Sequence, residues 1–112
     1  MKKFLFRLET PLRLRRRQVD RASQDLARAR VEVLLVRREM DRLEKERLHW
    51  ASAVPINEAG EFDLARDRRR WIYLDHLEMN LIQKNESLIP LNARVASCEV
   101  ALQQAVRDRQ IL

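Results

Sequence analysis

The 112-residue chain is poor in the residues that end helices and form tight turns. Glycine occurs once, at Gly60, and proline three times, at Pro11, Pro55 and Pro90. A strand-rich fold needs many turns and is therefore excluded. Aromatic residues make up 5% of the chain and charged residues 36%, which favours long solvated helices over a compact core.

Cysteine and histidine are equally scarce. Cys98 is single, so no disulfide can form within the chain. His49 and His76 do not have the spacing of a metal-binding pair, and no glycine-rich phosphate loop occurs. We therefore expect a protein that is not an enzyme and that has no cofactor and no metal.

Long apolar runs are also missing. No uncharged stretch approaches the ~20 residues of a membrane span. The opening Met-Lys-Lys-Phe-Leu-Phe is similar to the start of a signal peptide, but Arg7 and Glu9 interrupt it before an apolar stretch of ~7 residues can form. These features favour the cytosol over secretion.

The net charge of +6 is concentrated in the first half of the chain. Residues 1–53 carry 15 Lys and Arg against 8 Asp and Glu, which gives +7, whereas residues 54–112 carry 8 against 9, which gives −1. The charge is densest at Arg13, Arg15, Arg16, Arg17 and Arg21. Such a segment attracts acidic partners, although a solvated helix face has the same composition.

A heptad repeat organises the first half. Steps of three and four residues from Leu12 to Val54 meet apolar residues at all positions except two arginines: Leu12, Arg15, Val19, Ala22, Leu26, Ala29, Val33, Val36, Met40, Leu43, Arg47, Trp50 and Val54. A 3.5-residue apolar period of this length is typical of a coiled-coil seam. An amphipathic helix on a globular core is usually shorter.

A second heptad repeat of similar length follows. It comprises Leu74, Leu77, Leu81, Lys84, Leu88, Leu91, Val95, Cys98, Leu102, Ala105, Arg109 and Leu112, and it extends back through Trp71 and Leu64. Between the repeats, Pro55 ends the first helix and Asn57 and Gly60 can take positive φ. The fold class is therefore all-α, an antiparallel two-helix coiled-coil hairpin.

We expect a single domain. It consists of a helix over about 10–53, a turn over about 54–62 and a helix over about 63–112. Thr10 is expected to cap the first helix, with Pro11 as its first residue, and Asp63 to cap the second. Pro90 predicts a kink or an unwound turn near residues 86–90, or a full break as the alternative. Folding about residues 57–60 pairs Trp50 with the Trp71 end, Leu26 with Leu91 and Leu12 with Ala105.

Several apolar residues lie off both seams and would face water in a monomeric hairpin. They are Val31, Leu35, Ile72, Met79, Ile82, Ile89 and Val100. A stripe of this kind predicts a partner surface or self-association.

A basic segment that enters a heptad repeat is also the layout of a bZIP protein. Acidic residues return at Asp20, however, and the base-reading asparagine of a basic region is missing. No nucleic acid is expected as a partner, and a generic coiled-coil scaffold remains a further alternative.

The stretch Phe4-Leu5-Phe6-Arg7-Leu8-Glu9-Thr10-Pro11-Leu12-Arg13-Leu14-Arg15 resembles the start of the FliJ family of flagellar type III export proteins. Arg70-Trp71-Ile72-Tyr73-Leu74 and Leu77 resemble the start of the second helix of that family. Family members usually extend this helix beyond Gln110-Ile111-Leu112, so the chain is either shortened or naturally short, and part of an ATPase-contacting end would be missing.

The resemblance implies a stalk similar to that of rotary ATPases, which binds the hexameric flagellar export ATPase and the membrane protein of the export gate, and which also handles export chaperones. It implies a cytoplasmic protein at the cytoplasmic face of the bacterial inner membrane.

The ATPase-facing residues would be Arg13, Arg15, Arg16, Arg17 and Arg21. The gate-facing residues would be Glu39, Leu43, Trp50, Leu77 and Leu81, although four of these are also seam residues. The stalk protein of injectisome type III secretion has the same architecture and remains an alternative.

Overall fold

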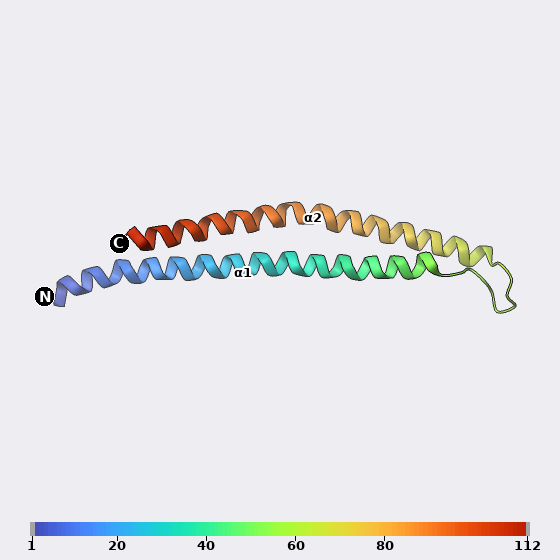
Figure 1. Cartoon of the computed structure of the whole chain (residues 1–112), viewed down its shortest axis with the longest axis horizontal. Coiled ribbons are helices and arrows are strands. Elements are labelled where there is room, and N and C mark those ends of the chain that lie inside the picture. The colour runs from blue at the N-terminus through green and yellow to red at the C-terminus, as the bar shows by residue number, and fades with distance from the viewer. Residues whose placement is uncertain (1, 112) are drawn as a thin grey trace. The chain divides into compact units, whose positions relative to one another are not determined.

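The protein consists of two long helices joined by a short connection. A computed structural model describes the backbone of residues 2–111 and the side chains of residues 10–110. Helix α1 spans Lys2–Ser52, with 51 residues, and helix α2 spans Leu64–Ile111, with 48 residues (Figure 1). Across the described backbone, the only β-type pairing is an isolated bridge between Ile56 and Phe62. The predicted all-α class is confirmed.

The chain forms two compact units. Unit 1 comprises residues 1–33 and 90–112, and unit 2 comprises residues 34–89. In each unit a segment of α1 runs antiparallel to a segment of α2 (Figure 1). Ion pairs cross unit 1 from Arg30 to Glu99 at 3.4 Å and from Arg94 to Glu32 at 3.2 Å. In unit 2 the rings of Trp50 and Tyr73 lie 4.9 Å apart. The predicted antiparallel hairpin is confirmed.

Both predicted seams lie between the helices over most of their length. The buried residues are all seam residues: Leu26, Ala29, Val33, Leu43 and Leu77. The other positions from Arg15 to Arg47 and from Leu74 to Ala105 are half-buried. A two-helix hairpin covers each seam from one side only, so half-burial is the expected state of most seam residues.

The seams end earlier than predicted at three places. Leu12 and Val54 are exposed at the ends of the first seam, and Arg109 is exposed near the end of the second. Trp71 and Leu64 are 60% and 67% exposed, so their predicted seam positions are wrong. The α2 seam instead continues from Leu74 through residues 70, 67 and 63, because strict alternation requires a step of four before Leu74.

The predicted start of the first helix is wrong. Helix α1 begins at Lys2 and continues through Pro11, so neither Thr10 nor Pro11 stands at its N-terminus. Residues 2–9 contain leucine, lysine, arginine and glutamate, which are strong helix formers, and no glycine. A proline inside a helix removes one backbone hydrogen bond, and here the helix continues despite that loss.

Helix α2 also continues through its proline. All residues from Leu64 to Ile111 are helical, so the alternatives of a full break and of an unwound turn near residues 86–90 are wrong. Pro90 has no N–H to donate to the carbonyl of Glu86. The predicted kink stays a prediction.

The residues expected to form the turn and to cap α2 do so, except that Asn57 does not have the expected backbone angle. The side-chain Oδ1 of Asn57 accepts hydrogen bonds from the backbone N–H groups of Ala59 at 3.0 Å and Glu61 at 2.9 Å. Gly60 has a φ of 79°, whereas Asn57 does not have positive φ. The Oδ1 of Asp63 accepts from the N–H of Arg66 at 3.1 Å, so Asp63 caps α2 as predicted.

The predicted register holds near the connection and is wrong by several residues in unit 1. In unit 2, Trp50 lies against Tyr73, close to its predicted partner Trp71. In unit 1, the pairing of Arg30 with Glu99 places Leu91 well away from Leu26, and Arg15 reaches Asp108, so Leu12 does not pair with Ala105. Residues 53–56 are not helical, and the carbonyls of Ala53 and Pro55 accept hydrogen bonds from Arg70 and Asp63. This short segment therefore lies beside about two turns of α2.

Among the described residues, neither helix contains an apolar segment long enough to cross a bilayer.

Candidate functional site

A basic face lies on the first half of α1, in unit 1. Arg13, Arg16, Arg17 and Arg21 are spaced by three, four and eight residues, which places them on one side of a helix. All four side chains are exposed. We call this set the basic face.

Arg15, the fifth predicted residue of this cluster, lies elsewhere. It occupies a seam position, is half-buried, and donates a hydrogen bond from Nη1 to the backbone carbonyl of Asp108. Its role in unit 1 is thus to join the two helices. The heptad count could have shown this, because Arg15 is itself a member of the first repeat.

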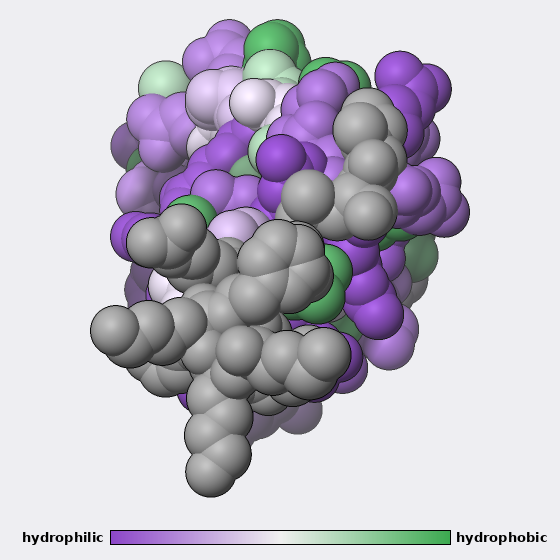
Figure 2. Space-filling view, turned by 90° about the vertical axis from the view of Figure 1, so that its left-hand side faces the viewer, coloured by the Kyte–Doolittle hydropathy of each residue, from purple (hydrophilic) through white to green (hydrophobic). Residues whose placement is uncertain are grey.

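The excess positive charge belongs to unit 1. Its residues carry 13 Lys and Arg against 6 Asp and Glu, a net charge of +7, while unit 2 carries 10 against 11, a net charge of −1. In the end-on view, the described surface is mostly hydrophilic, with apolar residues in small separate areas (Figure 2). Unit 1 therefore offers an acidic partner a strong electrostatic field.

At the connection, Arg70 ties the beginning of α2 to the end of α1. Its Nη1 donates to the carbonyls of Ala51 and Ala53, both at 3.2 Å, and its Nη2 pairs with Asp67 at 3.0 Å. Arg66 donates to the carbonyl of Ile56 at 2.9 Å. A cation suits this place, since the last carbonyls of a helix lack intrahelical partners and carry partial negative charge.

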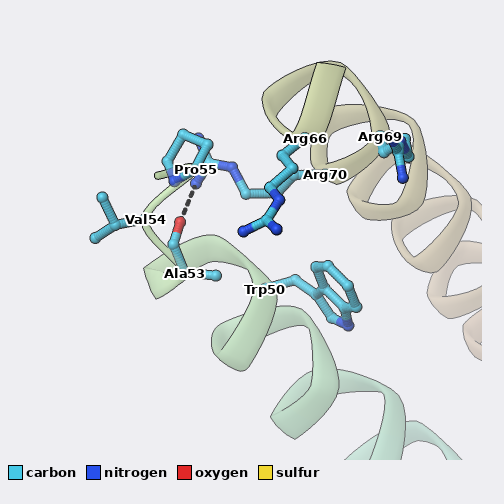
Figure 3. A pocket seen from close by; sticks show the side chains of 7 residues that line it. All are labelled: Trp50, Ala53, Val54, Pro55, Arg66, Arg69 and Arg70. Atoms are coloured by element: carbon cyan, nitrogen blue, oxygen red, sulfur yellow. Dashed lines mark hydrogen bonds between the residues drawn. The ribbon is translucent and has the colours of Figure 1, made fainter. Parts of the chain in front are cut away.

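These residues enclose a hollow of about 290 Å³ (Figure 3). It is lined by Trp50, Ala53, Val54, Pro55, Arg66, Arg69 and Arg70. Arg66 and Arg70 extend from α2 toward the end of α1, where Trp50 lies (Figure 3). Two of its arginines, Arg66 and Arg70, are engaged by backbone carbonyls and by the carboxylates of Asp63 and Asp67.

A polar network runs along one side of unit 2. The hydroxyl of Tyr73 donates a hydrogen bond to Oε1 of Glu46. The guanidinium of Arg42 forms ion pairs with the carboxylates of Glu46, at 3.3 Å, and Glu39, at 2.6 Å. The hydrogen bond to the Glu46 carboxylate, with partial burial and the charge of Glu46, raises the pKa of Tyr73. The hydrogen bond from Arg42 lowers the pKa of Glu39. Desolvation raises this pKa, whereas the positive charges of Arg42 and Lys84 lower it further.

The five predicted gate-facing residues all lie in unit 2 but in different surroundings. Leu43 and Leu77 are 5% and 2% exposed, so the seam covers them. Leu81 lies in a shallow hollow with Met40 and Leu88. Glu39 forms an ion pair with Arg42. The ring of Trp50 packs against Tyr73, and the Trp50 side chain is 36% exposed. Only Glu39, Trp50 and Leu81 therefore present side-chain surface to an incoming partner.

Sequence reasoning missed the contributions of Arg70 and Tyr73. The apolar Trp71 is a competing choice for the seam position beside Arg70, although strict heptad spacing selects Arg70. Tyr73 belongs to the aromatic start of the second helix in the FliJ resemblance. Its partner Glu46 is 27 residues away, and no local pattern predicts such a pair.

Among the described residues, no three or more of His, Cys, Asp and Glu are grouped to hold a metal ion.

Comparison with known proteins gives one informative result. Searches of curated proteins and of solved structures found no match. The family model described as Flagellar FliJ protein matches residues 3–112, which is nearly the whole chain and both helices. This family is a non-catalytic component of flagellar export. The chain therefore belongs to the FliJ family of flagellar proteins.

Proposed function

We propose that this export component acts as a non-enzymatic stalk that binds the hexameric flagellar export ATPase through its basic face. The observation that carries the proposal is the exposed set Arg13, Arg16, Arg17 and Arg21 in a unit of net charge +7. Family membership supplies the export setting.

The mechanism is mechanical and electrostatic. A two-helix coiled coil is stiff along its axis, and arginines on one face attract carboxylates in a ring. Contacts that are stronger in one nucleotide state of the ring than in another shift the ring toward the first state. The stalk would in this way promote ring assembly and bias hydrolysis without doing chemistry itself.

We further propose that unit 2 contacts the export gate protein and that the stalk also handles export chaperones. Glu39, Trp50 and Leu81 are the exposed or half-buried members of the gate-facing set. Leu43 and Leu77 support them from within the seam. Such contacts would place the protein at the cytoplasmic face of the inner membrane.

The test compares two pairs of adjacent arginines on α1. Arg16→Glu with Arg17→Glu reverses charge in the basic face, and Arg37→Glu with Arg38→Glu makes the same change at exposed positions of unit 2. Binding to the purified export ATPase hexamer and stimulation of its hydrolysis are measured for both. We expect at least about tenfold weaker binding for the first variant, since electrostatic steering and contact are both reversed, and little change for the second.

Equal behaviour of the two variants would contradict docking through the basic face. Absence of binding by the wild-type chain would remove the stalk role. Tight, steeply salt-dependent binding of labelled duplex DNA by the wild type, in place of the ATPase, would favour the nucleic-acid alternative.

A further inference from the structure

Helix α2 carries a second apolar stripe in unit 2, on the side away from α1. Its large apolar members are Ile72, Met79, Ile82 and Ile89, which are 65%, 57%, 53% and 71% exposed. Apolar side chains of this size are usually scattered on a surface, and an aligned set indicates a contact.

The stripe has heptad spacing. Steps of three and four residues connect Ala65, Arg68, Ile72, Asp75, Met79, Ile82, Glu86 and Ile89, and each of them is exposed. Each position from Ile72 onward lies two residues before a seam residue, and thus about 160° around the helix from the seam. Over more than three heptads this spacing is typical of a coiled-coil surface. Helix α2 therefore has one seam toward α1 and a second without a partner in the chain.

The polar residues of the stripe indicate what covers it. Arg68 lies near one end and Glu86 near the other, with Asp75 between them. Among the described residues, no ion pair or hydrogen bond engages these three side chains. A helix that docks on the stripe must bring a negative charge to Arg68 and a positive charge to Glu86.

We propose that this stripe is the contact between two copies of the chain, paired antiparallel through α2. In an antiparallel pair centred on residue 77, Arg68 of each copy lies opposite Glu86 of the other. The same register places Ile72 opposite Ile82 and Ala65 opposite Ile89. Every stripe position then meets a stripe position, and the two-fold axis makes both ion pairs at once.

The charges favour this register over both of its neighbours. A shift by one heptad, with Ile72 opposite Ile89, places Asp75 opposite Glu86 and so juxtaposes like charges twice. A shift the other way, with Ile72 opposite Asp75, forms neither ion pair. In the proposed register Asp75 faces Met79 of the other copy and loses part of its hydration, which weakens the dimer. We therefore expect a weak dimer that dissociates to monomers as the concentration falls.

This inference does not depend on the stalk proposal. It uses a different face of a different helix, and the purified chain alone is sufficient to test it. Failure of ATPase binding would leave it intact, and failure of dimerisation would leave the stalk role intact.

The test is sedimentation velocity at concentrations from about 1 to 200 μM on the wild type, Arg68→Glu and Glu86→Arg. We expect the wild type to dimerise. Each variant alone converts both ion pairs into like-charge pairs and should dimerise roughly tenfold more weakly or worse. An equimolar mixture of the two variants restores both ion pairs, so a heterodimer of about wild-type affinity is expected.

Arg38→Glu is the matched control, because Arg38 is exposed in unit 2 but lies on α1, outside the stripe. It should dimerise as the wild type does. Helical circular dichroism of all variants checks that the hairpin is intact. A wild-type chain that stays monomeric at 200 μM would overturn the proposal, as would a mixture that fails to associate or variants that dimerise unchanged.

Discussion

Single side chains join the helices at specific points, and Tyr73 gives the most direct readout of one of them. Its hydroxyl donates to Glu46 of α1, which raises its pKa. A raised folded-state pKa means that the stabilisation is fully present below the unfolded value of about 10 and is lost as the pH rises through the folded value. The contact therefore weakens only in alkaline solution.

Replacement of Glu46 tests this contact. Tyr73 is the only tyrosine, so the ultraviolet absorbance of phenolate reports it alone. We expect Glu46→Gln to lower the midpoint of the titration toward about 10, and Tyr73→Phe to remove the transition. An identical midpoint for Glu46→Gln and the wild type would show that the hydrogen bond does not form.

Arg70 is the second residue whose contact can be measured. Arg70→Ala removes the donors to the carbonyls of Ala51 and Ala53 and the ion pair with Asp67. We expect the free energy of unfolding to fall by about 1–2 kcal/mol. Arg69→Ala, at an exposed neighbouring position, should change it by less than about 0.5 kcal/mol. Urea denaturation separates the two, and equal losses would contradict the capping role of Arg70.

At the scale of elements, Pro90 interrupts the hydrogen bonding of α2 without ending it. Pro90→Ala restores an N–H that can donate to the carbonyl of Glu86 and removes the clash of the ring. Because Pro90 lies inside a long helix, we expect an increase in the free energy of unfolding of about 1–3 kcal/mol. Thermal unfolding followed by circular dichroism measures it. A decrease would mean that Pro90 makes a stabilising contact that outweighs the lost hydrogen bond.

The elements were predictable where heptad spacing determined them. Leu26, Val33, Leu43 and Leu77 lie in the seams because a 3.5-residue apolar period requires a facing helix. The helix start was not predictable, since Thr10-Pro11 is also compatible with the interior of a helix whose preceding residues favour helix. The N-cap of α2 at Asp63 was predictable from its position after the turn.

At the scale of the whole molecule, the hairpin was predictable, but its register in unit 1 was not. The residues of the turn centre, Asn57 and Gly60, were identified correctly. An equal rise on both sides of the turn would give the predicted register, but residues 53–56 are not helical. Register depends on such local differences in rise, and apolar spacing alone contains no information about them.

The candidate site was predictable in composition and only partly in arrangement. The arginine cluster was evident from charge density, but Arg15 belongs to the seam and the other four to one exposed face. Among the gate-facing residues, burial separates Leu43 and Leu77 from Glu39, Trp50 and Leu81. Both distinctions follow from which side of a helix a residue occupies, which requires the seam to be assigned first.

The most direct test of the proposed function asks which unit contacts the export ATPase. A photo-reactive amino acid is placed at Arg17 in unit 1 or at Glu58 in the connection, both exposed positions, and each chain is irradiated with the purified hexamer. The account predicts a cross-link to the ATPase from position 17 and none from position 58. A cross-link from position 58 alone would contradict it and would place the docking surface in unit 2.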